Sequence, residues 1–216
     1  MSVAGRTPRA ERAQGTRELI LVAAERLFAE HGVFVVSNRQ VSEAAGQGNN
    51  AAVGYHFGTK TDLIRAIIRK HNEEVGRLRA QQVATLSDPA GLRDWVGCLV
   101  RPMTEHLAAL GNPTWYARFS AQVMTDPVMR RVVIEESRSS PSLQQVVDGL
   151  RPHLPDLPPD VRAERNDMAR QLIVHICAER ERALAEGTPT PRASWHDAAT
   201  GLVDGIVGLW EAPVSR

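Results

Sequence analysis

The pattern of apolar and polar positions along the chain is helical nearly throughout. Apolar residues recur three or four positions apart, and the segments with this period are separated by Gly, Pro and short polar runs. A run of β-branched residues occurs only at residues 33–36, and it is too short to pair usefully as a strand. The pattern therefore predicts an all-α fold.

The first helix is expected to begin near Thr16, after a segment that mixes Gly, Pro and Arg without periodicity. Ile20 and Phe28 would line its buried face, and Gly32 would end it. Residues 1–15 are therefore interpreted as a mobile basic arm. Its arginines either touch phosphates or the minor groove of a nucleic acid, or form a solvated tail without a role.

Residues 37–60 contain two short helices joined by a polar turn. Ser37 and Gln40 have the spacing of a capping box, in which each side chain satisfies a backbone N–H at the helix start. In the second helix Val53 lies on one face and Tyr55 on the opposite one. Two short helices around a Gly-containing turn, apolar on one side only, indicate a helix-turn-helix, whose second helix enters the major groove of DNA.

The rest of the chain reads as helices separated by prolines. A long helix begins beside Thr59, at a second capping-box-like start, and continues to about Leu86. Further helices are expected over residues 90–110, 114–125, 127–137, 141–151, 161–186 and 194–211. The predicted units are the arm at 1–15, a helix-turn-helix domain at 16–62, a long helix at 63–86 and a helical bundle at 87–216; the family resemblance given below implies that the long helix connects the two parts and that the bundle serves regulation and dimerisation.

The charge is distributed unevenly along the chain. The formal net charge is only +1, which argues against a uniformly basic coat. Residues 1–86 contain 12 Lys and Arg against 8 Asp and Glu, a net charge of +4. Residues 87–216 contain 14 against 17, a net charge of −3. The positive end is therefore the end with the helix-turn-helix, as binding to phosphates requires.

The sequence contains few candidates for other chemistry. Cys98 and Cys177 lie far apart without a CxxC or His cluster, so neither a disulfide nor a metal site is predicted, and a reducing cytoplasm fits. No signal-peptide pattern or membrane-length apolar run occurs, so no membrane partner is expected. Paired carboxylates, a nucleophile elbow and a phosphate loop are all missing. We therefore expect neither an enzyme nor a cofactor.

The run from Glu18 to Leu63, with its LFAEHG, NRQVSEAAG and YHFGTKTDL segments, resembles the DNA-binding domain of TetR-family transcriptional regulators. The resemblance covers roughly the first third of the chain, and its YHF-x-x-K signature is specific in this context. It implies a homodimer that binds a double-stranded DNA operator, with a C-terminal bundle that dimerises and encloses a small-molecule effector. The turn looks one residue longer than the family's usual pattern, which leaves the base-contact register at Gln47 to Ala51 open.

Ten residues are candidates for DNA contact. They are Ser37, Asn38, Arg39, Asn49, Asn50, Ala51, Ala52, Tyr55, His56 and Lys60. Either Asn49 or Asn50 can cap the second helix or bond to adenine N6 and N7. Ala51 and Ala52 let the backbone approach the bases closely, although helix propensity alone can explain Ala52. The resemblance implies that the residues in and after the second helix hold the DNA backbone, namely Tyr55, His56 and Lys60.

Two further sets of residues are candidates for the regulatory part. Large apolar side chains gather at residues 95–124, where the resemblance implies an effector pocket; the candidate residues there are Trp95, Met103, Trp115, Phe119 and Met124. Core packing is the alternative for each of them. His175 is a further candidate, with a core or interface histidine as its alternative. The last helix carries a stripe of small residues at Gly201, Gly205 and Gly208. Glycine is costly inside a helix, so we expect close helix packing there. The resemblance implies dimerisation through the last two long helices, so a partner subunit is preferred to a helix of the same subunit.

The chain is thus predicted to be a ligand-responsive DNA-binding transcriptional regulator, a repressor in preference to an activator, that binds a palindromic operator as a dimer. The alternative is a helical small-molecule-binding or sequestering protein without operator binding. A sharply salt-dependent affinity for a palindromic duplex distinguishes the two.

Overall fold

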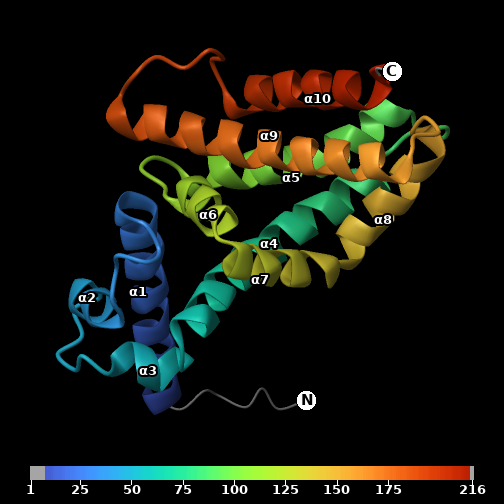
Figure 1. The fold of residues 1–216 in the computed structure, drawn as a ribbon. Helices are drawn as coiled ribbons and strands as arrows, with labels where there is room; N and C mark the ends of the chain where they lie inside the picture. Colours follow the sequence, from blue (N-terminus) through green and yellow to red (C-terminus); the bar gives the residue numbers. More distant parts are fainter. Residues whose placement is uncertain (1–7, 215–216) are drawn as a thin grey trace.

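The computed structural model describes residues 8–214, which form ten α-helices and one short 3₁₀ helix and contain no strand (Figure 1). The elements are α1 (Pro8–His31), α2 (Asn38–Ala44), α3 (Ala52–Phe57), α4 (Lys60–Ala84), α5 (Leu92–Leu110), α6 (Tyr116–Thr125), α7 (Pro127–Arg138), α8 (Pro141–Leu150), η1 (Arg151–His153), α9 (Pro159–Glu186) and α10 (Trp195–Glu211). The predicted all-α fold, with an N-terminal helix-turn-helix and a C-terminal helical bundle, is confirmed.

The start of the first helix was predicted wrongly. Helix α1 begins at Pro8 and not near Thr16, so residues 8–15 are helical and do not belong to a mobile arm. Proline is well suited to a first helical turn, and the run from Ala10 to Gln14 consists of good helix formers. The first turns of α1 form because of helix propensity and show no apolar periodicity. The apolar pattern therefore did not predict them. Residues 1–7, the rest of the predicted arm, lie outside the described residues.

From α4 onward the helices begin and end within two residues of the predicted positions. Local capping explains this accuracy. The Asp126 side chain accepts hydrogen bonds from the first two free N–H groups of α7, at 2.9 and 2.8 Å. Ser140 and Ser194 cap α8 and α10 in the same way, each accepting from the residue three positions on. These signals lie within a few residues of sequence, so they can be recognised without knowledge of the fold.

The helix-turn-helix and the last two helices lie at opposite ends of the molecule (Figure 1). Helices α1, α2 and α3 pack together at one end, and α4 leads from them into the bundle, where it packs against α5, α7 and α8. Helix α6 lies between α1 and α9, and Phe28 stacks on Phe119 there with ring centroids 6.2 Å apart. One hydrophobic core therefore continues from the N-terminal helices into the bundle.

A chain of buried polar side chains crosses this core where α1, α4, α5 and α6 meet. His71 Nε2 lies 2.8 Å from Glu25 Oε2, and His71 Nδ1 lies 2.7 Å from His106 Nε2. The His71 ring also stacks on Tyr116 at a centroid distance of 3.7 Å. Each ring nitrogen of His71 thus has a partner, so the chain is a satisfied network in an otherwise apolar contact.

A second buried polar contact joins α9 to the start of α6. Glu181 is only 1 % exposed, and its carboxylate accepts from the Ala117 and Arg118 N–H groups at 3.0 and 2.9 Å. It also accepts from Arg118 Nε at 3.1 Å. A carboxylate on one helix therefore satisfies the free N–H groups of another, which fixes α6 against α9.

The pH dependence of stability tests the buried chain. Burial, reinforced by the neighbouring His71, lowers the pKa of His106 from 6.5 to about 4. The unfolded chain binds a proton below pH 6.5 that the folded chain refuses, so stability is lost as the pH falls towards 4. We expect the free energy of unfolding to drop by about 1–2 kcal/mol between about pH 7 and pH 5 from this residue alone.

Urea unfolding at several pH values measures this loss. His106→Gln keeps a hydrogen-bonding side chain that does not titrate, so it should flatten the pH dependence. His153→Gln, at an exposed histidine, is the matched control and should leave it unchanged. An equally steep pH dependence in wild type and His106→Gln would contradict the assignment.

Candidate nucleic-acid interface

The predicted capping box at the start of α2 is confirmed. The Ser37 N–H donates to Gln40 Oε1 at 2.8 Å, and the Gln40 N–H donates to Ser37 Oγ at 3.2 Å. Both side chains are exposed, so the pair fixes the first turn of α2 at the surface. Capping accounts for Ser37, whose hydroxyl also remains accessible from outside.

Helices α2 and α3 are held together by a buried serine that the sequence did not single out. Ser42 is fully buried, and its hydroxyl donates to the Asn50 carbonyl at 3.3 Å and accepts from the Val53 N–H at 3.4 Å. Val41 and Val53 are also fully buried on either side of this contact. The serine thus ties α2 to the turn and to the first turn of α3, which fixes the angle between the two helices.

The outer face of the turn and of α3 is exposed, as predicted. Asn49, Asn50 and Ala51 are exposed, and Tyr55 is 80 % exposed. The N-cap of α3 is Ala51, so neither asparagine is the N-cap. Asn49 Oδ1 instead accepts from the Ala51 N–H at 2.9 Å, whereas within the described residues no hydrogen bond engages the Asn50 side chain. The whole Asn50 amide is therefore left for an outside partner, whereas Asn49 has its oxygen engaged.

Ala52 was predicted wrongly as a DNA-contact residue. It is only 7 % exposed and belongs to the hydrophobic core of the helix-turn-helix. Ala52 comes directly before Val53 in α3, and both side chains are turned inward. A small side chain here allows α3 to pack closely on its neighbours, which leaves little of Ala52 for a base to touch.

Arg39 and Asn38, both on α2, differ in how far their side chains are exposed to solvent. Arg39 is exposed over 71 % of its side chain and donates through Nε to Glu43 Oε1 at 2.8 Å. This hydrogen bond raises the pKa of Arg39, and the guanidinium stays charged. Asn38 is half-buried, and its Oδ1 is enclosed without a hydrogen-bond partner among the described residues. Arg39 is therefore the better placed of the two for contact with a phosphate or base.

Lys60 turns towards the protein and not simply outward. Its Nζ donates to the Val33 carbonyl at 3.1 Å and to the Val36 carbonyl at 2.5 Å. Partial burial lowers the pKa of Lys60. The ammonium holds the connection between α1 and α2, which accounts for a lysine at a helix N-terminus, where the dipole disfavours a cation. Sequence reasoning could not find this role, because the partners lie 24 and 27 residues away.

Arg17 on α1 is a further positioning residue that the sequence did not indicate. Its Nη1 donates to the His56 carbonyl at 2.6 Å, and its guanidinium lies 4.0 Å from the centre of the Phe57 ring. The His56 ring in turn lies edge-on to Tyr55 at a centroid distance of 4.9 Å. Arg17 thus fixes the end of α3, where the predicted backbone-contacting residues are found.

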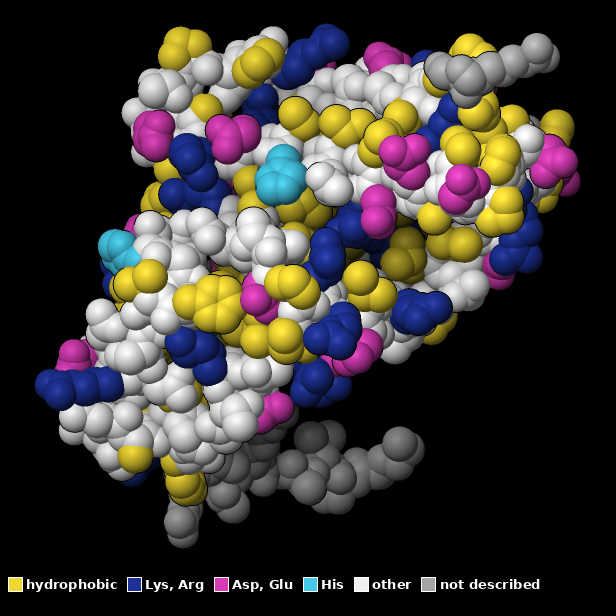
Figure 2. Space-filling view, in the orientation of Figure 1, with side chains coloured by type: hydrophobic (Ala, Val, Ile, Leu, Met, Phe, Trp, Pro, Cys, Tyr) yellow, Lys and Arg dark blue, Asp and Glu magenta, His cyan; other side chains and the backbone are white. Residues whose placement is uncertain are grey.

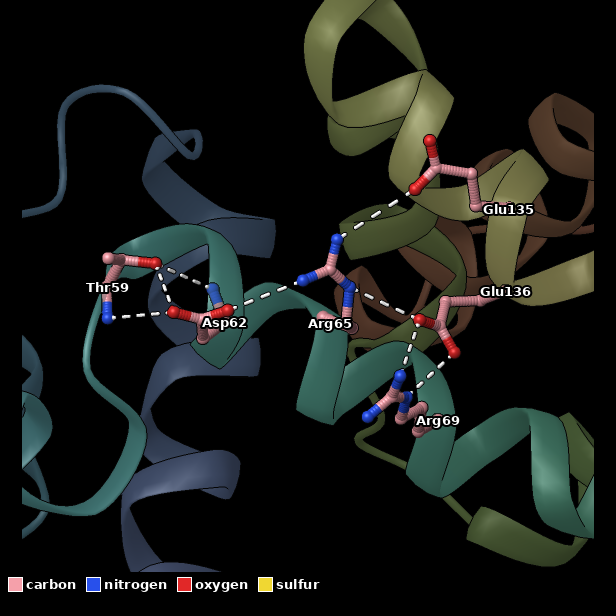
Figure 3. A network of polar contacts seen from close by, with 6 residues as sticks. All are labelled: Thr59, Asp62, Arg65, Arg69, Glu135 and Glu136. Atoms are coloured by element: carbon pink, nitrogen blue, oxygen red, sulfur yellow. Dashed lines mark hydrogen bonds and ion pairs between the residues drawn. The ribbon is translucent and has the colours of Figure 1, made fainter.

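A network of polar and charged side chains connects the start of α4 to α7 in the bundle (Figure 3). Thr59 Oγ1 donates to Asp62 Oδ2 at 2.6 Å, and this bond lowers the pKa of Asp62. Asp62 Oδ1 lies 3.4 Å from Arg65 Nη1, and Arg65 Nε lies 3.2 Å from Glu136 Oε1 on α7. Continuous polar contacts therefore run from the residue that caps α4 to α7 in the bundle.

Glu136 holds two arginines of α4 at once (Figure 3). Arg69 donates to both of its oxygens, through Nε at 2.8 Å and Nη2 at 3.0 Å, in a bidentate pair. Arg65 contacts Glu136 and, at 3.9 Å, Glu135. The Glu136 side chain is only 13 % exposed, whereas that of Arg69 is 62 % exposed, so the pair is shielded from solvent on one side only.

The structure does not bring the predicted effector residues together. Phe119 is fully buried and stacks on Phe28. Trp95 packs so closely on α8 that a Cβ added at Gly149 would lie 2.5 Å from its ring. These side chains fill the space between helices, which is the core-packing alternative.

The other four residues of that set are divided between two environments. Met124 and His175 line one cavity of about 310 Å³ beside α6, α7 and α9, and Met103 and Trp115 do not reach it. Met103 and Trp115 are half-buried and pack against the hydrophobic core. The prediction of a single pocket lined by all six residues is therefore wrong.

The small-residue stripe on α10 is open on the outside. A Cβ added at Gly205 or Gly208 would meet no atom within 4 Å, and one at Gly201 would meet only the Arg192 side chain. Gly201 and Gly205 line a groove of about 480 Å³ between α9 and α10. Figure 2 shows hydrophobic side chains along α9 beside it, where Leu172 and Ile176 are 38 % and 46 % exposed.

Residues 8–214 contain neither a metal-binding cluster nor a helix that could span a membrane. No group of three or more His, Cys, Asp or Glu side chains there could hold a metal ion. None of the helices there is long and apolar enough to cross a membrane.

Family models match both parts of the chain. Residues 20–67 match the model described as bacterial regulatory proteins, tetR family. Residues 97–208, slightly more than half of the chain, match the model described as tetracyclin repressor-like, C-terminal domain. The two matches correspond to the helix-turn-helix end and to the bundle.

Curated relatives match only part of the chain. The HTH-type transcriptional repressor AcnR of Corynebacterium glutamicum is 31% identical over 115 residues, 53% of this chain and 54% of the relative. The HTH-type transcriptional regulator TtgR of Pseudomonas putida is 35% identical over 82 residues, 38% of this chain and 39% of the relative. The chain thus matches about half or less of the length of these relatives.

Solved structures share the fold over nearly the whole chain. The multidrug binding protein EbrR complexed with imidazole has 24% identity and a TM-score of 0.53, with all of both chains covered. Mycobacterium smegmatis AmtR has 19% identity and a TM-score of 0.57, covering 99% of this chain and 90% of its own. A tetR family regulator from Shewanella sp. PV-4 has 17% identity and a TM-score of 0.60, with 93% and 99% covered.

Replacing Lys60 tests its contact with the α1–α2 connection. Lys60→Met leaves the Val33 and Val36 carbonyls without this donor, so we expect the free energy of unfolding to fall by about 1–3 kcal/mol. Lys70→Met removes an exposed lysine of the same helix, which pairs with Glu18 at 2.7 Å. That control should cost at most about 1 kcal/mol. Equal losses in the two variants, measured by urea unfolding, would show that the carbonyl contacts contribute nothing.

Proposed function

The chain belongs to the TetR family of bacterial regulatory proteins, and from this premise we propose that it binds a palindromic operator as a homodimer under the control of a small-molecule effector. Proteins of this family are transcription regulators and not enzymes, and the chain is a DNA-binding regulator. The observation that carries the proposal is the burial pattern of the helix-turn-helix. Its inner face, with Val41 and Val53, is buried in the core, and its outer face, with Asn50 and Tyr55, is exposed to solvent.

The exposed residues divide into two roles. Asn50 is proposed to read a base, because its free amide can bond bidentately to adenine N6 and N7. Tyr55 and Arg39 are proposed to hold phosphates, and Ala51 leaves room for the backbone to approach the groove. His56 would contribute through its position beside Tyr55 at the end of α3. Ser37, Asn38 and Lys60 are proposed as secondary contacts, because Ser37 and Lys60 are hydrogen-bonded within the protein and Asn38 is half-buried.

The surface at the far end of the molecule supports the proposed dimer. Met168, Leu172 and Ile176 are spaced four residues apart on α9 and are 41 %, 38 % and 46 % exposed. They continue into the groove lined by Gly201 and Gly205. A two-fold axis through this surface would bury it against its copy and leave both helix-turn-helix ends free. Repression is preferred to activation, and AcnR, whose name describes a repressor, supports that choice.

Selection of bound duplexes from a random pool tests the proposal as a whole. A homodimer should return a palindrome whose half-sites lie on successive major-groove faces, about 10 base pairs apart or a multiple of that. The affinity should fall steeply with salt, because phosphates are neutralised on binding. Recovery of no common sequence at any salt concentration would contradict operator binding.

Two substitutions separate base reading from phosphate binding. Asn50→Ala should lose roughly 1–3 kcal/mol of operator affinity and relax the preference at one base position. Tyr55→Phe removes only a hydroxyl from an exposed ring, so it should weaken binding to all duplexes to a similar extent. Both are measured by titration of operator and mismatched duplexes. If Asn50→Ala weakens every duplex equally, Asn50 does not read sequence, and Asn49 becomes the candidate.

The dimer surface is tested by filling the stripe on α10. Gly205→Leu should prevent close approach of the two copies and give monomers with an intact helical spectrum and poor operator binding. A Cβ added at Gly205 meets nothing within 4 Å in the subunit, and the rest of the leucine side chain would extend into the open groove, so misfolding is not expected. Gly15→Leu, at an equally open helical glycine on α1, is the control and should stay dimeric. Sedimentation of Gly205→Leu as a normal dimer would refute the surface.

A further inference from the structure

A cavity of about 310 Å³ lies where the α6–α7 corner meets α9, and its wall is positively charged. Two arginines from different helices line it, Arg130 near the start of α7 and Arg170 in α9. Gln171 and His175, also on α9, add side chains that can donate hydrogen bonds. No Asp or Glu side chain lines this cavity. We call it the α7–α9 cavity below.

Four further cavities among residues 8–214 differ from it in charge. Each has at least one carboxylate in its wall, such as Asp62 beside α1 and α4, Glu136 beside α7, Glu179 beside α10 and Glu105 beside α5. In the cavity beside α1 and α4 the cations are also paired already, as Arg69 is with Glu136. An added anion would be repelled or left without a free donor in these places. The α7–α9 cavity has neither obstacle.

The two arginines retain most of their hydrogen-bonding capacity. Among the described residues, no hydrogen bond or ion pair engages the side chain of Arg130, which is exposed. The Arg170 side chain is only 28 % exposed, and its Nη2 donates to Asp167 Oδ1 at 2.7 Å. A guanidinium has several N–H donors in a fixed plane, so most of those of Arg170 lack a partner in the part of the chain that the structure describes.

The carboxylates nearest in sequence leave this excess of positive charge in place. Asp126 caps α7, and its Oδ1 accepts from two backbone N–H groups at 2.9 and 2.8 Å. Asp167 pairs with Arg170, but the Asp167 side chain is 67 % exposed. An ion pair open to solvent contributes little to stability, so a ligand carboxylate can compete with Asp167 for the Arg170 guanidinium.

The rest of the wall is apolar and small. Met124 and Val174 contribute the apolar part, and Met124 is 9 % exposed. The Thr125 hydroxyl also reaches the wall, but it donates to the Gln122 carbonyl at 2.7 Å and therefore offers only an acceptor. A volume of about 310 Å³ lies at the lower end of the range for small-molecule sites. The α7–α9 cavity therefore fits a small ligand.

We propose that the α7–α9 cavity binds a small ligand bearing carboxylate or phosphate groups, held between Arg130 and Arg170. The inference deepens the proposed function, on which it rests, because it gives the effector a chemical class. A guanidinium presents a planar fork that matches the oxygens of a carboxylate or phosphate with parallel hydrogen bonds. Gln171 and His175 supply further donors from the same helix.

The proposed dimer leaves this cavity open. Arg170 and Leu172 are two residues apart on α9, and so are Val174 and Ile176. Residues two positions apart on a helix point in nearly opposite directions. Leu172 and Ile176 belong to the proposed dimer surface, so Arg170 and Val174 lie on the other side of α9. A second copy of the chain would therefore not fill the α7–α9 cavity.

A ligand in this place would act on the helix that leads to the DNA. Arg130 and Glu136 lie on the same helix, α7, and Glu136 holds Arg65 and Arg69 of α4. A ligand that joins Arg130 to Arg170 would fix α7 against α9. It would therefore favour those positions of α7, and through Glu136 of α4, in which both arginines reach the ligand.

Titration calorimetry with succinate and with inorganic phosphate tests the binding site. Ionic strength is held constant with sodium chloride, and succinamide is the neutral analogue. We expect wild type to bind at least one of the two anions and not succinamide; which anion binds shows whether the ligand group is a carboxylate or a phosphate. Failure of both anions to bind wild type would overturn the inference.

Two substitutions in the wall and one beside it locate the site. Arg130→Gln and Arg170→Gln should each weaken anion binding by at least about 10-fold, because each removes a charge-assisted hydrogen bond. Arg131→Gln is the matched control, since it removes the same charge from the next residue of α7, which is exposed and does not line the cavity. It should bind the anion as wild type does. Equal weakening by Arg130→Gln and Arg131→Gln would overturn the inference.

Operator titrations with and without the bound anion, at equal ionic strength, test the effector role. Wild type and Arg131→Gln should lose operator affinity several-fold with the anion, and Arg130→Gln should not. An equal loss in Arg130→Gln would show that the anion merely competes with DNA, and it would overturn the effector role. If the anion binds through Arg130 but no duplex is selected, the cavity stands and the proposed function fails. If the operator is bound but neither anion is, the reverse holds.

Discussion

The buried face of α4 packs against two groups of helices in succession, and the rest of the structure depends on this continuity. Near its start, Leu63, Ile64 and Ile67 are fully buried in the same core as α1 and α3. Further along, His71 and Val75 belong to the contact with α5. A single helix that supplies side chains to both regions cannot tilt in one without changing its packing in the other. Close packing therefore links the DNA-contacting end to the bundle more firmly than the chain connection alone would.

Polar contacts on both sides of α4 further restrict the positions that this helix can take relative to its neighbours. On the outside, Glu136 of α7 holds two arginines of α4, and the contact extends through Asp62 to the residue that caps α4. On the inside, His71 joins α4 to Glu25 on α1 and His106 on α5. Hydrogen bonds and ion pairs require specific geometry, so a shifted α4 must either break them or exchange partners. A helix with few alternative arrangements is suited to a switch between discrete states.

Helix caps and apolar periodicity were readable from the sequence, whereas contacts between residues distant in sequence were not. The boundaries of α7 and α8 follow from Asp126 and Ser140, whose caps are local. The exposure of Tyr55 follows from helical periodicity. The buried position of Ala52, the carbonyl contacts of Lys60 and the packing of Trp95 depend on helices that are distant in sequence. For the aromatic cluster, a pocket and a filled core have the same composition, so no pattern in the sequence could distinguish them.

The clearest departures from an apolar core gather on α4 and its partners. His71 and Arg79 occupy positions where Leu or Met would pack without a desolvation cost, and both face α5. His71 is satisfied within the subunit, which makes it part of the architecture. Arg79 is not satisfied, and a fold selected for stability alone would have replaced it. Conflicts between local chemistry and its surroundings are expected where function imposes them. The packing of α4 on α5 therefore carries a desolvation cost at Arg79 that no hydrogen bond or ion pair among the described residues offsets.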